Sequence, residues 1–465
     1  MNTVRIPIFT SDNDILNKAF RTAFSDLVSN IAPYGEKKEN VFLAGSGYDT
    51  PWTRDAAINT WNCCGLLAGD IAKNTLLSVL EENSGEIMIG GEYWDAVIWI
   101  IGAWYEYLYT GDKTFLETAL RAGENSIKYF EETEFSKELN LFRGPACYGD
   151  GVSAYPDMYV GDGSGIIRFV TSYPDKLAET GIGIPMYTLS TNCLYYYLYV
   201  ILDKMRKTLG KECAYKDKSE KMKNAVNRYF WNEEKGLYRY IADDFGGCDS
   251  AENLGQSFAV LFGIADREQS KKIMEKTYIT PNGIPCVWPN FKRYDDNHGF
   301  GRHSGTIWPH IEGFFADAAC KCGRTDIFEN ELLLMAKKAV RDGNFAEIYH
   351  PYTGEIYGGI QEHNNGGIRE WESVLKQTWS ASGFIRMIIF DLFGMEFSEN
   401  EILINPANLA SVKECRLDNI KWKDCILSVS VKRNGEKSFK INGKKYKQNI
   451  FKPSKDKEYL IEINI

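Results

Sequence analysis

The chain has 465 residues, of which 44% are hydrophobic and 25% are charged, a composition typical of globular proteins with one large or a few ordinary domains. Its formal net charge of −9 argues against a nucleic-acid partner or an anionic membrane surface. The most apolar stretch, Val97 to Trp104, is too short and too polar at its flanks to span a bilayer.

Helical periodicity recurs along most of the chain. We expect about a dozen helices, and local signals such as Gly210 and Gly323 stand where two of them should end. The predicted helices cover Asn13–Ile31, Thr53–Ala68, Ile71–Leu80, Tyr93–Thr110, Thr114–Glu132, Thr191–Leu209, Lys216–Phe230, Asn253–Gly263, Asp266–Lys276, Ser304–Cys322, Asp326–Val340 and Ser373–Phe393.

The connections between these helices alternate between short and long. Short links surround Gly69, Gly111 and Gly210, whereas the intervening links are much longer, and long loops in compact domains are usually functional. If successive helices run up and down, the long loops all emerge at one end. Six helical hairpins closed into a ring would gather those loops around a central pocket. We therefore predict a mainly α protein with an (α/α)6 barrel over residues 1–395.

After Gly394 the pattern changes to short strands separated by turns. Asn434-Gly435 and Asn442-Gly443 have the sequence of two-residue hairpin turns. We expect a small C-terminal antiparallel β domain over residues 396–465. Its predicted strands are Glu401–Asn405, Cys415–Ile420, Cys425–Arg433, Ser438–Ile441 and Tyr459–Ile463.

Cysteine and histidine usage gives no sign of a disulfide framework or a metal site. The 11 cysteines are odd in number, and neither the adjacent Cys63-Cys64 pair nor the Cys320-x-Cys322 pair is followed by a His/Cys partner cluster. The first ten residues lack the long apolar run of a signal peptide. We expect reduced thiols, a cytoplasmic location, and no metal or other cofactor.

The first segment with candidate chemistry lies at the entry to the second predicted helix. Arg54 and Asp55 stand side by side. Arg54 can donate a hydrogen bond to one sugar hydroxyl, and Asp55 can accept a hydrogen bond from its neighbour. Tyr48 and Trp52 supply aromatic walls that suit the C–H face of a pyranose. The alternative is a helix start with a local ion pair.

The second segment lies in the longest predicted loop. Asp150 stands between Gly149 and Gly151, which permit close approach of a ligand, and aromatic residues such as Tyr148 and Tyr155 are nearby. The alternative is an ordinary Asp-Gly turn.

The third segment precedes the last predicted helix. Glu347 stands just before an aromatic-Pro-Gly turn, and Trp379 follows downstream. A surface carboxylate near a helix end is the alternative for Glu347.

Two further segments start helices on the same loop face. Trp94-Asp95 opens the fourth helix, and His303 and Trp308 open the tenth. We include all four as candidate pocket residues, although Trp308 is equally suited to a core and His303 to a structural hydrogen bond.

These motifs resemble those of a known group of enzymes. Trp52-Thr-Arg54-Asp55 before an apolar helix resembles the glucoamylases. The run from Glu347 through Tyr349, Pro351 and Thr353-Gly, followed by Trp379-Ser-Ala, resembles mannosylglycerate hydrolases and the processing α-glucosidase I group. These are inverting six-hairpin glycosidases, and the resemblance extends over the helical part by order and spacing.

The resemblance implies roles for individual residues. Arg54 and Asp55 would hold the non-reducing sugar, Asp150 would act as general acid, and Glu347 as general base. Glu362 lies nearer to Trp379 in the sequence and is the alternative base. An inverting glycosidase needs such a pair, one carboxyl that protonates the leaving oxygen and one carboxylate that activates water.

The expected function is an exo-acting glycoside hydrolase with a small carbohydrate substrate. An α-glucoside is the default by resemblance, and α-mannosides and α-rhamnosides remain open. Two other classes are considered, a sugar epimerase that would need a proton-shuttling pair such as His303 and His363, and a non-catalytic sugar-binding protein.

Overall fold

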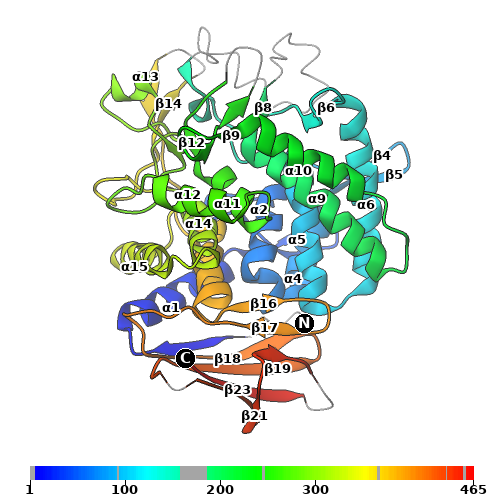
Figure 1. The fold of residues 1–465 in the computed structure, drawn as a ribbon, viewed down its shortest axis with the longest axis vertical. Helices are drawn as coiled ribbons and strands as arrows, with labels where there is room; N and C mark the ends of the chain where they lie inside the picture. Colours follow the sequence, from blue (N-terminus) through cyan, green and yellow to red (C-terminus); the bar gives the residue numbers. More distant parts are fainter. Residues whose placement is uncertain are drawn as a thin grey trace.

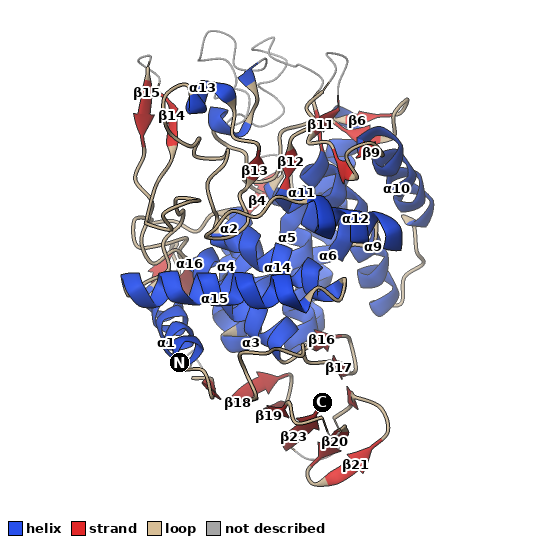
Figure 2. Cartoon of the chain, turned by 60° about the vertical axis from the view of Figure 1, so that its left-hand side comes forward, coloured by secondary structure: helices blue, strands red, loops and turns tan. Residues whose placement is uncertain are grey.

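The computed structural model describes residues 6–91, 94–157, 186–242, 247–363, 367–435, 437–453 and 457–465, and this part of the chain is mainly helical. Among these residues, six helices form a closed ring, in which each contacts the next and the last returns to the first. In ring order they are α2 (Thr53–Asn59), α5 (Asp95–Thr110), α9 (Leu189–Thr208), α11 (Asn253–Leu261), α14 (Pro309–Lys321) and α16 (Thr378–Arg386). Figure 2 shows the helical part of the chain above the C-terminal strands.

A second set of helices covers the outside of this ring. These are α1 (Asp14–Ser29), α4 (Gly69–Ser78), α6 (Lys113–Thr133), α10 (Lys216–Phe230), α12 (Arg267–Lys276) and α15 (Thr325–Asp342). The division follows from composition, because a helix that is apolar on all sides must be buried on all sides. Fourteen of the 16 residues of α5 are buried, compared with five of the 15 residues of α10.

The inner helices approach closely where small residues face one another. A Cβ atom on Gly102 of α5 would lie 2.7 Å from the backbone of Ala57 in α2, so only glycine permits this contact. Two inner helices continue into short π-helical segments, η1 (Thr60–Cys64) after α2 and η4 (Met387–Leu392) after α16. The remaining helical pieces are α3 (Gly65–Leu67), α13 (Lys292–Asp295) and the 3-10 turn η2 (Val152–Ala154).

The helix predictions are confirmed to within about two residues, except at the starts of two helices. The predicted Ser304–Cys322 and Ser373–Phe393 helices begin later, at Pro309 and Thr378. The first starts late because Ile307 pairs with Tyr349 through two backbone hydrogen bonds of 2.9 and 3.0 Å, which holds this segment extended. Tyr93, the predicted first residue of the fourth helix, lies outside the described residues.

The two ends of the ring differ (Figure 1). At one end, the connections carry short antiparallel strand pairs, and at the other end a larger sheet packs under the helices. The short strands are β2 (Ile31–Tyr34), β3 (Glu39–Phe42), β4 (Leu80–Asn83), β5 (Glu86–Ile89), β6 (Phe135–Ser136), β7 (Leu141–Phe142), β8 (Tyr187–Thr188), β9 (Trp231–Asn232), β10 (Leu237–Tyr238), β11 (Ile241–Ala242), β12 (Ala251–Glu252), β13 (Val287–Trp288), β14 (Ile360–Glu362) and β15 (Ile368–Glu370).

The larger sheet corrects the expectation of an antiparallel C-terminal domain in two respects. Its order is β1-β18-β19-β23-β20-β21, so a strand from the start of the chain, β1 (Ile8–Ser11), forms one edge. In addition, β19 and β23 pair in parallel, whereas the other pairs are antiparallel. The C-terminal strands are β18 (Glu414–Trp422), β19 (Cys425–Lys432), β20 (Ser438–Ile441), β21 (Lys444–Tyr446) and β23 (Glu458–Asn464), and β16 (Met395–Phe397), β17 (Ile402–Ile404) and β22 (Ile450–Phe451) form a separate three-stranded sheet.

One of the two predicted hairpin turns is confirmed. Asn442-Gly443 joins β20 to β21 with both residues at positive φ, as a tight turn of this type requires. Asn434-Gly435 does not join a hairpin, because β23 lies between β19 and β20 in the sheet. A local turn signal cannot reveal that a later strand inserts between its neighbours.

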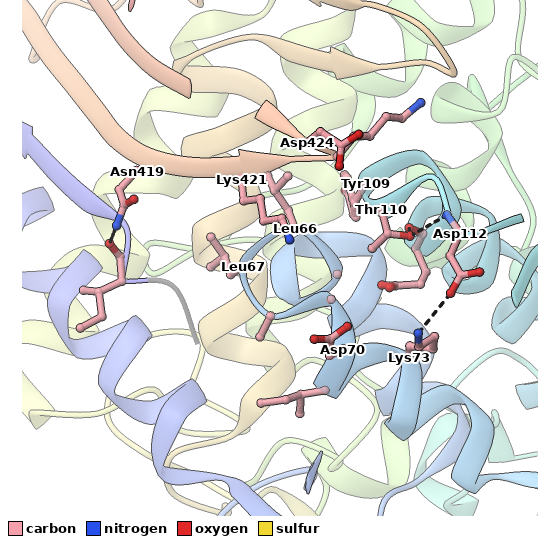
Figure 3. Close-up of a pocket in the computed structure, with 17 residues that line it drawn as sticks. Leu66, Leu67, Asp70, Lys73, Tyr109, Thr110, Asp112, Asn419, Lys421 and Asp424 are labelled. Atoms are coloured by element: carbon pink, nitrogen blue, oxygen red, sulfur yellow. Dashed lines mark hydrogen bonds and ion pairs between the residues drawn. The ribbon is translucent and has the colours of Figure 1, made fainter. Parts of the chain in front are cut away.

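The sheet and the helices share one apolar core, in which residues of α1, α15 and α16 pack against β18, β19 and β23. Trp422 of β18 donates a hydrogen bond to the carbonyl of Leu108 near the end of α5, at 2.9 Å. A cavity of about 670 Å³ lies at this junction (Figure 3). Its lining includes the Lys73–Asp112 ion pair, with Nζ and Oδ2 3.1 Å apart.

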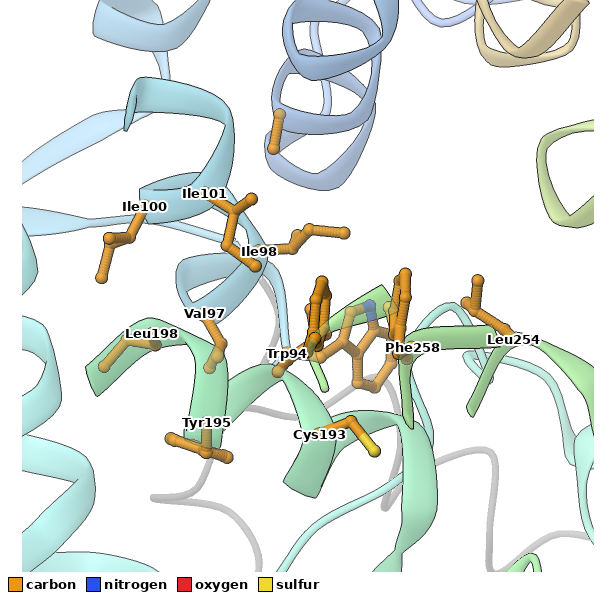
Figure 4. Packing of buried hydrophobic residues seen from close by; sticks show 14 of the residues in the cluster. Trp94, Val97, Ile98, Ile100, Ile101, Cys193, Tyr195, Leu198, Leu254 and Phe258 are labelled. Atoms are coloured by element: carbon orange, nitrogen blue, oxygen red, sulfur yellow. The ribbon is translucent and has the colours of Figure 1, made fainter. Parts of the chain in front are cut away.

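A second core fills the space between inner helices toward the loop end. Figure 4 shows Trp94 and Val97 at the start of α5 beside Tyr195 and Leu198 of α9, with Phe258 of α11 close by. This packing fixes where the helices begin, and therefore where the loop residues at their ends are held.

All 11 cysteines are free, in agreement with the expectation of reduced thiols. Among the described residues, no helix is long and apolar enough to cross a membrane.

Candidate active site

A cavity of about 130 Å³ lies where three inner helices begin, at the end of the ring away from the larger sheet. Trp52, Trp308 and Gln377 are the residues that immediately precede α2, α14 and α16. The cavity is lined by Tyr48, Trp52, Arg54, Asp55, Tyr148, Asp150, Arg302, His303, Trp308, Glu347, Gln377 and Trp379. The structure thus brings together side chains from all three sequence segments that were singled out.

Asp150 faces the cavity between two basic side chains. Its Oδ2 accepts a hydrogen bond from Arg54 Nη2 at 2.7 Å, and its Oδ1 lies 3.3 Å from His303 Nε2. Burial alone would raise the pKa of Asp150, but Arg54, the hydrogen bond from His303 and the charge of Arg302 together lower it below its usual range. In the absence of a ligand, Asp150 is therefore ionised.

The backbone around Asp150 is held tightly. Tyr148 has a positive φ of 60°, which is a strained backbone conformation for a residue with a large side chain. Strained conformations of this kind cluster at functional sites. A Cβ atom on Gly151 would lie 2.2 Å from Gln361 Oε1 and 3.0 Å from the His303 ring. The glycine beside Asp150 is thus required by close packing of the protein itself, not by approach of a ligand as the sequence suggested.

Glu347 is held from the other side of the cavity. Its Oε2 pairs with Arg302 Nη2 at 2.7 Å, and its Oε1 accepts a hydrogen bond from the Tyr48 hydroxyl at 3.4 Å. Only 3% of its side chain is exposed, compared with 32% for Asp150. Arg302 binds Glu347 and the next residue, His303, binds Asp150, so two consecutive residues connect the two carboxyl groups.

Asp55 lies deeper in the cavity wall. Burial raises its pKa to about 8, opposed by Arg54 and reinforced by Asp95. Trp52 is 39% exposed, and the guanidinium carbon of Arg54 lies 6.0 Å from its ring centroid. The Tyr48-to-Asp55 segment therefore forms part of the cavity, and is not merely the start of a helix.

Several buried polar atoms in this wall have no hydrogen-bond partner among the described residues. They are Asp55 Oδ1, Gln377 Oε1 and Trp379 Nε1. Buried polar groups in folded proteins are almost always paired, so three such atoms around one cavity indicate positions for ligand hydroxyls.

Aromatic rings form the floor beside the two carboxylates. The Trp308 ring stacks on His303 with centroids 4.9 Å apart, and Trp379 stacks on His310 at 4.3 Å. Burial lowers the pKa of His310 to about 3, so the ring that supports Trp379 is uncharged. Trp308 and Trp379 therefore line the cavity as predicted.

Two predicted residues of the fourth helix lie outside the cavity wall. Trp94 is fully buried behind Arg54, with the guanidinium carbon 5.5 Å from its ring centroid. Asp95 is also buried, and its charge contributes to the raised pKa of Asp55. Both belong to the first turn of the fourth predicted helix, which the core holds in place from behind.

Glu362 is also outside the wall. Its two oxygens accept hydrogen bonds from Arg293 Nε at 2.7 Å and the Tyr294 hydroxyl at 2.6 Å. Arg293 in turn donates to the carbonyl of Val152 at 3.0 Å. Glu362 therefore supports the loop that carries Asp150. The structure places Glu347, not Glu362, in the cavity.

Sequence reasoning missed Arg302, which holds Glu347. An isolated arginine in a glycine-rich segment carries no periodic or spacing signal, and only its position beside His303 could have drawn attention to it. His363, the second histidine of the epimerase alternative, is not among the residues that line the cavity. No cluster of metal-ligating side chains is found in the described ranges.

The cavity at the junction with the sheet is larger but has a different character. The one aromatic side chain among its described lining residues, Tyr109, uses its hydroxyl to bond the Trp61 carbonyl at 2.7 Å. The described lining of this junction cavity therefore lacks aromatic walls on which a sugar ring could stack.

Solved structures with a similar fold include several glycosidases. A sialidase matches with a TM-score of 0.70 and 15% identity over 95% of the chain, which spans 40% of that protein. The GH63 mannosylglycerate hydrolase from Thermus thermophilus, in complex with glucose, gives 0.62 and 12% identity over 80% of this chain and 99% of that one. The GH78 rhamnosidase of a Bacillus species gives a TM-score of 0.60 with 12% identity, over 93% of this chain and 42% of that one.

At these identities the similarity shows the fold. No curated protein matches the sequence. The model of the mannosylglycerate hydrolase MGH1-like glycoside hydrolase domain matches residues 98–380, more than half of the chain, and this span includes Asp150, His303 and Glu347. The chain therefore belongs to the MGH1-like glycoside hydrolase family and is a glycosidase.

Proposed function

We propose that this glycosidase is an inverting, exo-acting enzyme that cleaves an α-linked glycoside or short oligosaccharide, with Asp150 as general acid and Glu347 as general base. The observation that carries the proposal is the pair of carboxyl groups in one small cavity, each held by different cationic or hydroxyl partners. In the proposed reaction, Asp150 protonates the leaving glycosidic oxygen while Glu347 takes a proton from the attacking water.

The positions of the basic groups support this division of labour. Arg302 and Tyr48 keep Glu347 oriented toward the cavity, as a general base requires. Asp150 is ionised without ligand, so the acid role requires that its pKa rise when substrate binds. We infer that sugar hydroxyls take over the hydrogen bond of Arg54 and so weaken the largest of the three interactions that lower this pKa.

The cavity size supports exo action on a terminal sugar. About 130 Å³ is well below the roughly 300–1,000 Å³ of pockets that enclose drug-sized ligands, and is suited to a single sugar ring. Asp55, Gln377 and Trp379 would bind its hydroxyls through their unpaired polar atoms. An α-glucoside is the first choice by family resemblance, and α-mannosides and α-rhamnosides belong in the same screen.

We further propose that the ring of helices is an (α/α)6 barrel that forms a catalytic domain over residues 1–395, with residues 396–465 as a small β domain. The β1 strand would then be exchanged from the first domain into the sheet of the second. A cytoplasmic location is part of the proposal and is consistent with 11 free cysteines.

The experiment compares Asp150→Asn and Glu347→Gln on two substrates that differ in leaving group. Asp150→Asn should lose about 10²–10⁴-fold in kcat on an alkyl glycoside but far less on a dinitrophenyl glycoside, whose leaving group needs no proton. Glu347→Gln should lose similar factors on both. Both variants should still bind the sugar. Full turnover by either variant on the alkyl glycoside would refute the assignment, and a protein with no turnover of any tested glycoside would instead favour a non-catalytic binding function.

A further inference from the structure

His303 connects Asp150 to a buried polar network behind the cavity. Its Nε2 lies 3.3 Å from Asp150 Oδ1, and its Nδ1 lies 3.0 Å from Ser153 Oγ. Ser153 Oγ also accepts a hydrogen bond from the backbone N–H of His303 at 3.1 Å and lies 2.7 Å from Gln361 Oε1. Asp150, His303, Ser153 and Gln361 form a chain of four side chains, of which the last three are buried.

The distances in this chain determine where its protons lie. The amide oxygen of Gln361 faces Ser153, because it also accepts the backbone N–H of Ser153 at 3.4 Å. Two oxygens 2.7 Å apart need a proton between them, and an amide oxygen has none to give. The single hydroxyl proton of Ser153 therefore points to Gln361. Ser153 Oγ can then only accept from the imidazole, so Nδ1 of His303 carries a proton.

This arrangement defines the other face of the imidazole. If the ring is neutral and protonated on Nδ1, its Nε2 has a lone pair that accepts a hydrogen bond from a protonated Asp150 carboxyl. If the ring is an imidazolium, Nε2–H donates to an Asp150 carboxylate. In both of these states, one proton lies between Nε2 and Oδ1.

We propose that Ser153 and Gln361 are positioning residues that act through His303 to keep this one proton at Asp150 for delivery to the leaving oxygen. The inference rests on the proposed acid role of Asp150. Without substrate, Arg54 stabilises the carboxylate and the proton resides on Nε2. When the sugar takes over Arg54, the proton transfers to Oδ1, His303 becomes neutral, and Asp150 then gives the proton to the glycosidic oxygen.

The groups around His303 lower its pKa in the ligand-free site, so an imidazolium there is a ready proton donor to Asp150. Burial lowers the pKa of His303, as does the charge of Arg302, whereas Asp150 and Glu347 raise it. The Tyr148 ring lies 5.6 Å away and Trp308 stacks on the ring at 4.9 Å, so these two neighbours present aromatic faces to the imidazole, not carboxylates. The neighbouring His310 is held uncharged by burial.

The test uses Gln361→Met, which keeps the side-chain length but removes the acceptor oxygen, and Ser153→Ala. With Gln361→Met the Ser153 hydroxyl is free to donate to Nδ1, which moves the imidazole proton to Nε2 in the neutral ring. We expect both variants to lower kcat on an alkyl glycoside about 10–100-fold, with KM and the rate on a dinitrophenyl glycoside within about threefold. Ser257→Ala is the matched control, because this buried serine bonds the Asn253 carbonyl of its own helix, at 2.6 Å.

Two readouts separate this role from a structural one. A loss that is equal on both glycosides, or no loss on either, would overturn the proposal. The second readout is the ¹⁵N spectrum of labelled histidine, which is tractable because the chain has five histidines, with His303 assigned by its absence in His303→Gln. The Nδ1 of His303 should be protonated in the wild type and should lose that proton in Gln361→Met. An unprotonated Nδ1 in the wild type would also overturn the proposal, even if a variant folds poorly.

If Asp150→Asn shows no leaving-group dependence, the acid assignment itself fails. If Asp150→Asn shows it and Ser153→Ala does not, only the present inference fails.

Discussion

The substitution Gly151→Ala tests how closely the loop of Asp150 must pack against its support. Gly151 has φ −110° and ψ 147°, an extended conformation that alanine adopts readily, so any effect arises from the added methyl group. That methyl would lie 2.2 Å from Gln361 Oε1 and 3.0 Å from the ring atoms of His303. Non-bonded carbon contacts are normally about 3.5–4.0 Å, so the loop or the network must shift by about 1 Å.

Two magnitudes follow from that shift. Overpacking of this kind destabilises proteins by about 1–3 kcal/mol, and a 1 Å displacement of a catalytic group costs about 100-fold in rate. We therefore expect Gly151→Ala to fold, to unfold at lower urea concentration, and to lose about 100-fold in kcat on an alkyl glycoside. Steady-state kinetics and urea unfolding measure the two effects.

Gly47→Ala provides the matched control. It adds the same methyl group beside Tyr48 of the cavity, but its nearest neighbour, Val374 Cγ1, would lie at an ordinary 3.7 Å. We expect kcat and stability close to those of the wild type. If Gly151→Ala retains kcat within about threefold, or if Gly47→Ala loses as much, the tight support of Asp150 is not what controls its activity.

Four further predictions concern the rest of the site. Arg302→Met should destabilise the fold by about 3–5 kcal/mol in urea unfolding, because it leaves buried Glu347 without its cation. Unchanged stability would contradict this role. Glu362→Gln should lose less than about tenfold in kcat, far less than Glu347→Gln, since Glu362 bonds Arg293 and Tyr294 outside the cavity; an equal loss would restore Glu362 as the base. The pKa of Asp55, raised by burial to about 8, means that the folded protein binds this proton more tightly than the unfolded chain, so stability is lost as pH rises from about 4 to 8. Asp55→Asn should therefore gain stability relative to the wild type by up to about 1.4 kcal/mol per pH unit between pH 5 and 8, as measured by urea unfolding. A difference in unfolding free energy that stays constant over this range would be inconsistent with the buried acid. Dialysis against EDTA should leave kcat unchanged, and a loss restored by a divalent cation would show a metal that the described residues do not predict.

The extent to which sequence predicts this structure depends on the range of the interactions involved. The helix Lys216–Phe230 was predicted with its observed bounds, since its apolar face and its ends are encoded locally. The pairing of β1 with β18 joins residues about 400 positions apart, and no local pattern specifies it. The late start of α14 likewise depends on the backbone pairing of Ile307 with Tyr349.

The candidate site was predicted by residue type and loop position better than by geometry. Asp150 and Glu347 lie in segments where a carboxylate stands among glycines or aromatics, and both line the cavity. Which of Glu347 and Glu362 faces the cavity depends on Arg302 and Arg293, which select one carboxylate each in three dimensions. That choice cannot be made from spacing along the chain.

The measurement that tests the central claim most directly is the configuration of the sugar at the moment of its release. A screen of aryl glycosides and disaccharides identifies a substrate, and ¹H NMR then follows the anomeric proton of the first product before mutarotation. If Glu347 activates water across the ring from Asp150, an α-glycoside must first yield the β-anomer. An α-anomer as first product would mean that a covalent intermediate forms, and the arrangement of acid and base proposed for this cavity would be wrong.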